Sequence, residues 1–332
     1  MILISFGTRP EWIKIKPLLD KLKGKIPFKL VCTGQHSSLI DASTKDYSIE
    51  YLYIEEYKNR LDSIFISILQ CADVIFKDVS HVMVQGDTTS ALAMALAAFH
   101  RKIPIIHLEA GLRSFDKENP YPEEFNRISI GAMADIHLCP TKTSLYNLNN
   151  VKSINSSAHV VGNTVLDNLK HLKSTLEPIV LITLHRRENL YNVKDWFNAI
   201  EELAIENPHL EFIFPMHPNP EIQKHKNIFK TVKTILPLSH EDCIDYISRC
   251  SLIITDSGGI QEESAFLKKK CIVCRKTTER IEGMGRFSQL CKEPMSLKSV
   301  FTNTKIELIS DVCPYGDGYA SDKIACILEN IM

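Results

Sequence analysis

The fold class is decided by the stretch Ile2-Leu-Ile-Ser-Phe6-Gly-Thr-Arg-Pro-Glu11 at the start of the chain. Its apolar run predicts a buried strand, Gly7 permits a tight turn, and Pro10 suits the first turn of a helix. The helical pattern continues to Leu22, and short apolar runs then alternate with amphipathic runs along the whole chain. Such alternation is typical of βαβ units, so the sequence predicts an α/β fold with parallel sheets and helices on both faces.

The predicted elements follow from this alternation. The runs expected to form strands are Ile2–Phe6, Phe28–Thr33, His81–Gln85, Pro104–Glu109, Ile136–Cys139, His159–Val161, Ile179–Leu184, Glu211–Pro215, Leu252–Thr255 and Cys271–Arg275. The main segments expected to form helices are Arg9–Leu22, Ser90–His100, Pro122–Ala132, Val193–Glu206, Gly259–Leu267 and Ser321–Ile331.

The pattern of strand and helix starts twice, which predicts two domains. Ser174-Thr-Leu-Glu-Pro178 interrupts a helical stretch just before a fresh strand begins. We therefore expect one Rossmann-like domain at 1–171 and another at 172–315, followed by a C-terminal helix at 316–332 that packs back on the first domain. Two doubly wound domains facing each other would hold their ligand in a cleft, outside the carboxyl ends of the strands.

The overall charge excludes some classes of partner. The chain has 332 residues, with 39 Lys and Arg against 40 Asp and Glu, a formal net charge of -1. A protein that binds the phosphate backbone needs an excess of basic residues, so we expect no nucleic-acid partner. A hydrophobic fraction of 44% spread along the chain predicts folded domains rather than disorder. No stretch approaches the ~20 apolar residues of a membrane span, and the N-terminus lacks a basic leader, so we expect neither membrane association nor secretion.

The ten cysteines predict a reducing, cytoplasmic environment, because most occur singly in apolar runs. Cys271-Ile-Val-Cys274 has the CxxC spacing of some metal and redox sites. We favour a buried strand here, because no second CxxC and no nearby His completes a ligand set. We therefore expect no metal.

Charged side chains follow several predicted strands in the N-terminal half. Arg9 and Lys14 flank a helix start and are placed to face an anion. Asp87, Glu109 and Glu123 lie in three further loops. Helix capping would explain the Asp in Gly86-Asp-Thr-Thr-Ser90, and the helix dipole would explain a Glu in the first turn of a helix. Neither effect explains why three acidic loops converge. Carboxylates gathered in a cleft are suited to proton transfer.

The C-terminal half carries a basic loop and a glycine-rich one. The strand before His185-Arg-Arg-Glu-Asn189 ends in a His followed by two Arg. Ser257, Gly258 and Gly259 follow another strand and open a helix, where bare amides favour a phosphate. Glu263 lies about one and a half turns further and is placed to reach ribose hydroxyls. These residues predict a nucleotide site.

Taken in order, these strings resemble the non-hydrolysing UDP-N-acetylglucosamine 2-epimerases. The matching strings are Phe6-Gly-Thr-Arg-Pro-Glu11, Thr33-Gly-Gln-His36, Gly86-Asp-Thr-Thr89, Glu109-Ala-Gly-Leu-Arg113, Pro122-Glu-Glu124, Asn126-Arg127, Gly162-Asn-Thr164, His185-Arg-Arg-Glu188, Asp256-Ser-Gly-Gly-Ile-Gln-Glu-Glu263, Thr277-Thr-Glu-Arg280 and Pro314-Tyr-Gly-Asp-Gly318. They span nearly the whole chain in the order of the family. The resemblance implies a two-domain GT-B fold and an isomerase.

The resemblance also implies a reaction, which is the reversible interconversion of UDP-GlcNAc and UDP-ManNAc. In that family UDP is eliminated in the anti sense to give an enzyme-held 2-acetamidoglucal, and it adds back with the opposite configuration at C2. No metal or nicotinamide cofactor is required. Members serve bacterial surface polysaccharides and commonly form dimers, so we expect a homodimer in the cytoplasm.

Motif matching implies the role of each site residue. The acid/base group implied is Asp87, Glu109 and Glu123. The residues implied to hold the diphosphate and assist its departure are His185 and Arg9, with Lys14 nearby. Those implied to hold the phosphates and ribose are Ser257, Gly258, Gly259 and Glu263. Arg113 and Arg127 fall in matching strings and are expected to contact substrate.

The sequence departs from the family in several places. Some members bind a second UDP-GlcNAc near the residues matching Gln35, His36 and His217, but Ser38 stands here where a Gln is common in the regulated members. The usual Gly-Lys-Pro before a late strand is replaced by Lys268-Lys-Lys-Cys271.

Other functions compete with this interpretation. Relatives act on modified UDP-N-acetyl sugars such as diacetamido uronic acids, and their motifs differ only slightly. A GT-B glycosyltransferase shares the fold and nucleotide half but has no need of three carboxylate loops. A hydrolysing epimerase, whose counterparts lack these Glu-Ala-Gly-Leu-Arg and His-Arg-Arg-Glu strings, and a non-catalytic nucleotide-sugar sensor are further alternatives.

Overall fold

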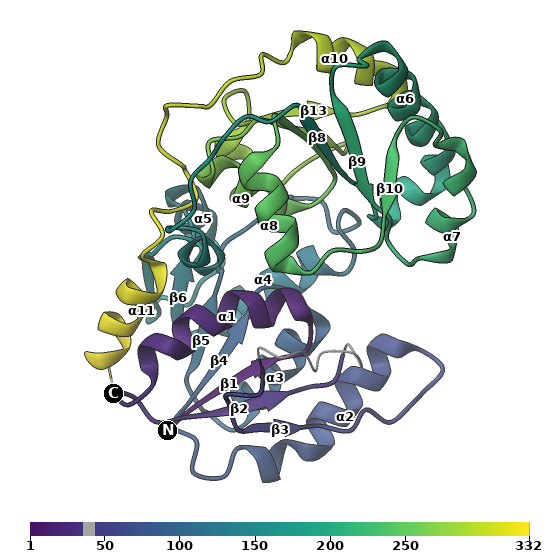
Figure 1. Ribbon diagram of the computed structural model, residues 1–332. Coiled ribbons are helices and arrows are strands. Elements are labelled where there is room, and N and C mark those ends of the chain that lie inside the picture. The colour runs from purple at the N-terminus through teal and green to yellow at the C-terminus, as the bar shows by residue number, and fades with distance from the viewer. Residues whose placement is uncertain (36–43, 332) are drawn as a thin grey trace. The chain divides into compact units, whose positions relative to one another are not determined.

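The computed structural model describes residues 1–35 and 44–331 (Figure 1). The chain divides into two compact units. The first comprises Met1–Asn168 and Gly316–Met332, and the second comprises Leu169–Tyr315. Each unit has one parallel sheet with helices interleaved along the chain. The predicted α/β class with two parallel sheets is therefore confirmed.

The first unit has a seven-stranded sheet in the order β3-β2-β1-β4-β5-β6-β7. Its strands are β1 (Ile2–Phe6), β2 (Phe28–Cys32), β3 (Ile49–Tyr51), β4 (His81–Gln85), β5 (Ile105–Leu108), β6 (Ile136–Cys139) and β7 (Ser157–Val160). The central strand β1 pairs in parallel with β2 and β4, with Ile2 level with Phe28 and with His81. Because all strands run the same way, the carboxyl ends of β1, β4 and β5 lie together at one edge.

Helices cover both faces of this sheet. They are α1 (Arg9–Leu22), α2 (Arg60–Ile75), α3 (Thr89–His100), α4 (Glu123–Met133), α5 (Lys142–Leu148), the 3-10 helix η2 (Thr164–Asn168) and α11 (Ala320–Glu329). Side chains of β1 alternate between the faces, as a strand requires. Ile4 packs in one core with Trp12 of α1 and Ile324 of α11, whereas Leu3 packs in the other core with Ile64 of α2. In Figure 1, α11 lies beside α1, with which it is in contact.

The second unit has a six-stranded parallel sheet in the order β10-β9-β8-β11-β12-β13. Its strands are β8 (Ile179–Thr183), β9 (Glu211–Pro215), β10 (Lys233–Ile235), β11 (Leu252–Thr255), β12 (Cys271–Cys274) and β13 (Ser288–Cys291). Its helices are α6 (Val193–Glu206), α7 (Pro220–Gln223), α8 (His240–Arg249), α9 (Gly258–Phe266), α10 (Leu297–Asn303) and the 3-10 helices η3 (Arg187–Asn192), η4 (Lys226–Ile228), η5 (Ile281–Gly283) and η6 (Pro294–Ser296).

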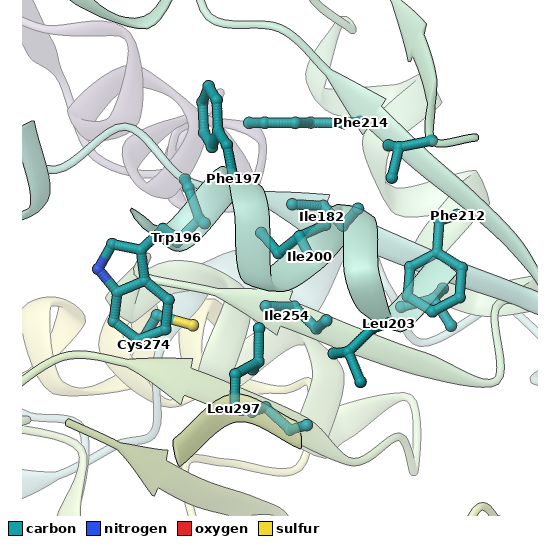
Figure 2. Close-up of a cluster of buried hydrophobic side chains, with 14 of the residues drawn as sticks. Ile182, Trp196, Phe197, Ile200, Leu203, Phe212, Phe214, Ile254, Cys274 and Leu297 are labelled. Atoms are coloured by element: carbon teal, nitrogen blue, oxygen red, sulfur yellow. The ribbon is translucent and has the colours of Figure 1, made fainter. Parts of the chain in front are cut away.

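An apolar core fixes the central strands of the second unit (Figure 2). Trp196, Phe197 and Ile200 of α6 pack over Ile182 of β8 and Ile254 of β11. Each of these side chains is buried, and burial of a large apolar side chain contributes about 1.5–3 kcal/mol. The core therefore holds the ends of β8 and β11, where the candidate site residues of this unit begin.

Two further expectations concern single segments. Cys271 and Cys274 lie in β12 with buried thiols, which confirms the buried strand predicted for the CxxC run. Burial raises the pKa of the Cys271 thiol to about 12, so this thiol is unreactive at neutral pH. Within residues 1–35 and 44–331, no helix is both long and apolar enough to cross a membrane.

Candidate active site

Glu109 is the centre of a polar cluster in the first unit. Lys14 Nζ donates to both of its carboxylate oxygens, at 2.7 Å and 2.6 Å. Gln85 Nε2 donates to Glu109 Oε2 at 2.5 Å, and Asn163 Nδ2 donates to Glu109 Oε1 at 3.0 Å. Only 9% of Glu109 is exposed. The donors come from α1, the end of β4 and the loop after β7, so three separate elements orient this carboxylate.

The backbone brings Glu109 into this position. It follows β5 directly and adopts a φ of 64°, in the left-handed region that residues other than glycine rarely occupy. Gly86, at the end of the adjacent β4, lies so close that a Cβ on it would be 3.5 Å from Glu109 Oε2. Strained backbone of this kind clusters at functional sites. The geometry therefore places the Glu109 carboxylate beside the loop that carries Asp87.

Asp87 is held by an arginine from α4. Arg127 reaches Asp87 Oδ2 through Nε and Nη2, each at 2.7 Å, and Asn126 Nδ2 donates to the Asp87 carbonyl oxygen at 2.8 Å. Arg127 also contacts Glu124, whose carboxylate is buried and accepts from the Ser114 backbone amide. A quarter of the Asp87 side chain stays exposed. This carboxylate is thus oriented on one side and accessible on the other.

The remaining predicted residues of this unit have different environments. Arg9 is exposed at the start of α1, and Glu123 is half-buried at the start of α4. Gln35 Oε1 accepts from the Ser90 hydroxyl at 2.7 Å. Arg113 is buried, and its Nη1 donates to a neighbouring carbonyl oxygen at 2.7 Å, so the structure does not bring it into the Glu109 cluster. His36 lies outside the described residues.

In the second unit the buried carboxylate of Asp256 organises the loop that carries His185. It accepts from the backbone amides of His185 and Arg186 at 2.8 to 3.2 Å, and from Asn189 Nδ2 at 3.0 Å. Asn189 also donates to the Cys274 carbonyl oxygen, so it links the loop after β8 to the end of β12. Asp256 therefore fixes a turn at the ends of β8, β11 and β12.

His185 and His217 lie against each other at the ends of β8 and β9. Their rings stack with centroids 5.3 Å apart and an interplanar angle of 16°. Partial burial and, secondarily, the neighbouring His185 lower the pKa of His217. His217 Nδ1 accepts a bond from the Asn219 amide at 3.1 Å, which matches a neutral ring. The arrangement leaves an imidazole pair at this edge of the sheet.

The start of α9 is closely packed against an arginine. Ser257 precedes the helix, and its side chain makes no capping bond. A Cβ on Gly258 would lie 3.0 Å from the Arg280 guanidinium, whereas a Cβ on Gly259 would have no neighbour closer than 3.9 Å. Arg280 Nε in turn donates to Glu262 Oε1 at 2.8 Å. The absence of a side chain at Gly258 thus lets the guanidinium approach the helix N-terminus.

Glu263, on the same helix, has a partner from α8. His240 Nε2 lies 2.8 Å from Glu263 Oε1, and 7% of the Glu263 side chain is exposed. Among the described residues no group of three or more His, Cys, Asp or Glu side chains is arranged to hold a metal ion. The second unit therefore offers an anion-favouring helix start followed by an oriented carboxylate.

Comparison with known proteins identifies the family. A model of the family described as UDP-N-acetylglucosamine 2-epimerase matches residues 20–329. The UDP-N-acetylglucosamine 2-epimerase of Campylobacter jejuni is 36% identical, over 98% of this chain and 97% of the relative. The chain belongs to the UDP-N-acetylglucosamine 2-epimerase family.

Solved structures agree with this family. The structure of UDP-GlcNAc 2-epimerase from Neisseria meningitidis bound to UDP-GlcNAc has a TM-score of 0.90 at 31% identity, with 99% of each chain covered. The Methanocaldococcus jannaschii UDP-GlcNAc 2-epimerase in complex with UDP-GlcNAc and UDP has a TM-score of 0.82 at 30% identity, again over 99% of each chain. The family expected from the ordered motifs, its GT-B class of fold and the assignment as an isomerase are confirmed.

Several residues of the candidate site were not identified from the sequence. Gln85, Asp256 and His240 received no role, although each contacts a residue that did. Asn189 also received none, although it binds Asp256. A polar residue that ends or directly follows a buried strand was the available signal for Gln85 and Asp256. His240 carried no such signal, because only the packing of α8 beside α9 brings it to Glu263.

Proposed function

We propose that this protein interconverts UDP-GlcNAc and UDP-ManNAc by anti elimination of UDP and re-addition. The single observation that carries the proposal is the carboxylate of Glu109, bound by Lys14, Gln85 and Asn163 beside the Asp87 loop. Family membership and the UDP-GlcNAc bound in the Neisseria meningitidis structure support UDP-GlcNAc as the substrate. An oriented carboxylate group is the equipment that removal of a carbon-bound proton requires.

The bonds formed and broken balance in both directions of the proposed reaction. UDP departs from C1 with the electron pair of the C1–O bond, and a carboxylate takes the C2 proton while the C1–C2 double bond forms. In the return step a proton reaches C2 from the opposite face and UDP bonds again to C1. We assign the proton transfers to Asp87, Glu109 and Glu123 as a group. Coupled acids share their titration, so the proton transfers belong to the group rather than to one carboxylate.

Positive and polar groups assist the departing diphosphate in this proposal. Arg9, Lys14 and His185 offer cationic or donor groups to the negative charge that develops on the diphosphate. Electrostatic stabilisation of this kind is the largest contribution to the rate enhancement of many enzymes. The amides of Ser257, Gly258 and Gly259 at the start of α9 hold phosphate, and Glu263 holds ribose. Arg127 orients Asp87. We propose no cofactor.

The biological setting is also part of the proposal. We propose a cytoplasmic homodimer that supplies UDP-ManNAc for bacterial surface polysaccharides. In this proposal the domain at 1–171 carries the acid/base group, the domain at 172–315 carries the nucleotide site, and 316–332 is a C-terminal helix. Gln35, His36 and His217 match an activator site of regulated relatives, but Ser38 argues against such regulation here.

Proton NMR in D₂O tests the reaction. We expect UDP-GlcNAc to give UDP-ManNAc with deuterium at C2 of both epimers, because the proton removed exchanges with solvent. Release of free ManNAc would indicate the hydrolysing reaction, and absence of exchange would contradict the proposal. Exchange only with a diacetamido uronic acid analogue would replace the substrate but keep the reaction.

Variants locate the chemistry. Asp87→Asn and Glu109→Gln should each abolish deuterium exchange while UDP still binds, because each removes a proton acceptor without touching α9. Asp73→Asn is the matched control, since 91% of that side chain is exposed and it pairs with Arg101 on the surface. If either site variant keeps near wild-type turnover, the role assigned to that carboxylate is wrong.

A further inference from the structure

The contact between His240 and Glu263 gives the nucleotide site a component that no motif predicts. His240 is the first residue of α8, and Ser239 caps that helix by accepting from the Asp242 amide at 3.0 Å. The imidazole is therefore attached to a fixed helix start rather than to a loop. Its Nε2 lies 2.8 Å from Glu263 Oε1.

Glu263 has few other restraints. Oε1 is bound to His240, and Oε2 has no partner among residues 1–35 and 44–331. The side chain as a whole is 7% exposed, so the carboxylate has little room to move. A carboxylate oxygen that no protein donor holds is available to accept a hydrogen bond from a hydroxyl group of a bound ligand.

The spacing along α9 fits a nucleoside diphosphate. Glu263 lies five residues after Gly258, which corresponds to a rise of about 7.5 Å along the helix. A diphosphate at the helix N-terminus therefore leaves the ribose beside the Glu263 side chain, as the proposed function requires. Burial and, secondarily, the carboxylate of Glu263 raise the pKa of the Cys243 thiol, which lies one turn after His240, and α8 and α9 are in contact.

We propose that His240 is a positioning residue that sets the ribose specificity of the site. Its Nε2–H group occupies Glu263 Oε1 and turns Oε2 toward the ribose hydroxyls. Without the imidazole the carboxylate samples other rotamers, and hydroxyl recognition weakens. This inference rests on the proposed function, because it takes uridine diphosphate as the ligand of α9.

Calorimetric titration with UDP, 2′-deoxy-UDP and 3′-deoxy-UDP tests the inference. For the wild type we expect at least one deoxy analogue to bind about tenfold more weakly than UDP, the effect of one hydrogen bond to a charged acceptor. His240→Ala should weaken UDP by about tenfold and bring that ratio close to one. His240→Gln should keep both values within about threefold, because the amide nitrogen reaches a position similar to that of Nε2.

A double-mutant cycle shows whether His240 acts through Glu263. In the Glu263→Gln background, His240→Ala should cause no further loss of UDP affinity. His209→Ala, at an exposed position in the turn after α6, is the matched control and should bind as the wild type does.

The outcomes separate the two proposals. If His240→Ala weakens UDP and both deoxy analogues equally, the residue has only a packing role and the inference is overturned. Unchanged binding in that variant overturns it as well, while the nucleotide site stands. If the wild type binds no UDP, the proposed function and the inference both fail.

Discussion

Replacing Asp256 should destabilise the second unit and release the His185 loop. Asp256→Ala removes the acceptor of three groups, namely the backbone amides of His185 and Arg186 and the side-chain amide of Asn189. Hydrogen bonds to a charged group contribute about 1.5–3 kcal/mol each, and the low end applies because the loop is partly solvated. The loss of about 4–5 kcal/mol is offset by about 1–2 kcal/mol, since a buried charge is also removed.

We therefore expect Asp256→Ala to lower the free energy of unfolding of this unit by about 3 kcal/mol. Asp256→Asn keeps one side-chain oxygen as an acceptor and should lose about half as much. Asp256→Ala should also lose amide hydrogen-exchange protection at Arg186, because the backbone amide of Arg186 donates to Asp256 Oδ2 at 2.8 Å.

Urea unfolding followed by tryptophan fluorescence measures this effect. The chain has two tryptophans, and Trp196 lies in the core of the second unit, so a Trp12→Phe background makes it the sole reporter. Asp245→Asn is the matched control, because 60% of that side chain is exposed and its pair with Arg249 is a surface pair. A loss below about 1 kcal/mol for Asp256→Ala would refute the organising role of this carboxylate.

Three further predictions concern other parts of the chain. Gly258→Ala should lower Tm more than Gly259→Ala, because only the first Cβ meets the Arg280 guanidinium at 3.0 Å; equal shifts would contradict that packing. Burial alone would raise the pKa of the Glu201 carboxylate, but three neighbouring backbone N–H donors outweigh it and lower this pKa. The wild type should therefore have a higher Tm than Glu201→Gln at pH 7, and this difference should disappear as the pH falls below about 4.3. Burial lowers the pKa of His107 to about 4. As the pH falls from 6.5 to 4, this histidine should therefore lower the free energy of unfolding of the first unit by about 1.4 kcal/mol per pH unit. Urea unfolding measured across this pH range should show a flatter profile for His107→Gln.

The central strands could be predicted because their own residues are apolar and β-favouring. Ile179–Thr183 and Leu252–Thr255 are buried along their whole length, so the local pattern and the tertiary environment agree. The strands that were not predicted are β3, β10 and β13, which are short and contain polar residues. All three lie at a sheet edge, where pairing on one side replaces full burial. Their formation depends on a neighbour that the local sequence does not encode.

The candidate site divides in the same way. Asp87, Glu109 and His185 could be proposed because each lies within two residues of the end of a strand, and strand ends are where parallel sheets place their ligands. Gln85 and His240 act through contacts with residues 24 and 23 positions away in the chain. Such pairs follow from the order of strands and the packing of helices, so the local sequence pattern does not predict them. Sequence patterns therefore indicate the residues proposed to meet substrate better than those that orient them.

The buried charges of the second unit show why orientation takes charged residues rather than apolar ones. Arg275 is 1% exposed and donates to Glu188 in the loop after β8 and to Glu279 in the loop after β12. Glu279 also pairs with Arg280, which binds Glu262 of α9. Apolar replacements of such groups are often neutral or stabilising, so stability alone does not account for this chain of ion pairs. Directional bonds fix three loop geometries at once, whereas apolar contacts would allow each loop to slide. We therefore interpret the network as the element that keeps the loops after β8, β11 and β12 in one arrangement before any ligand binds.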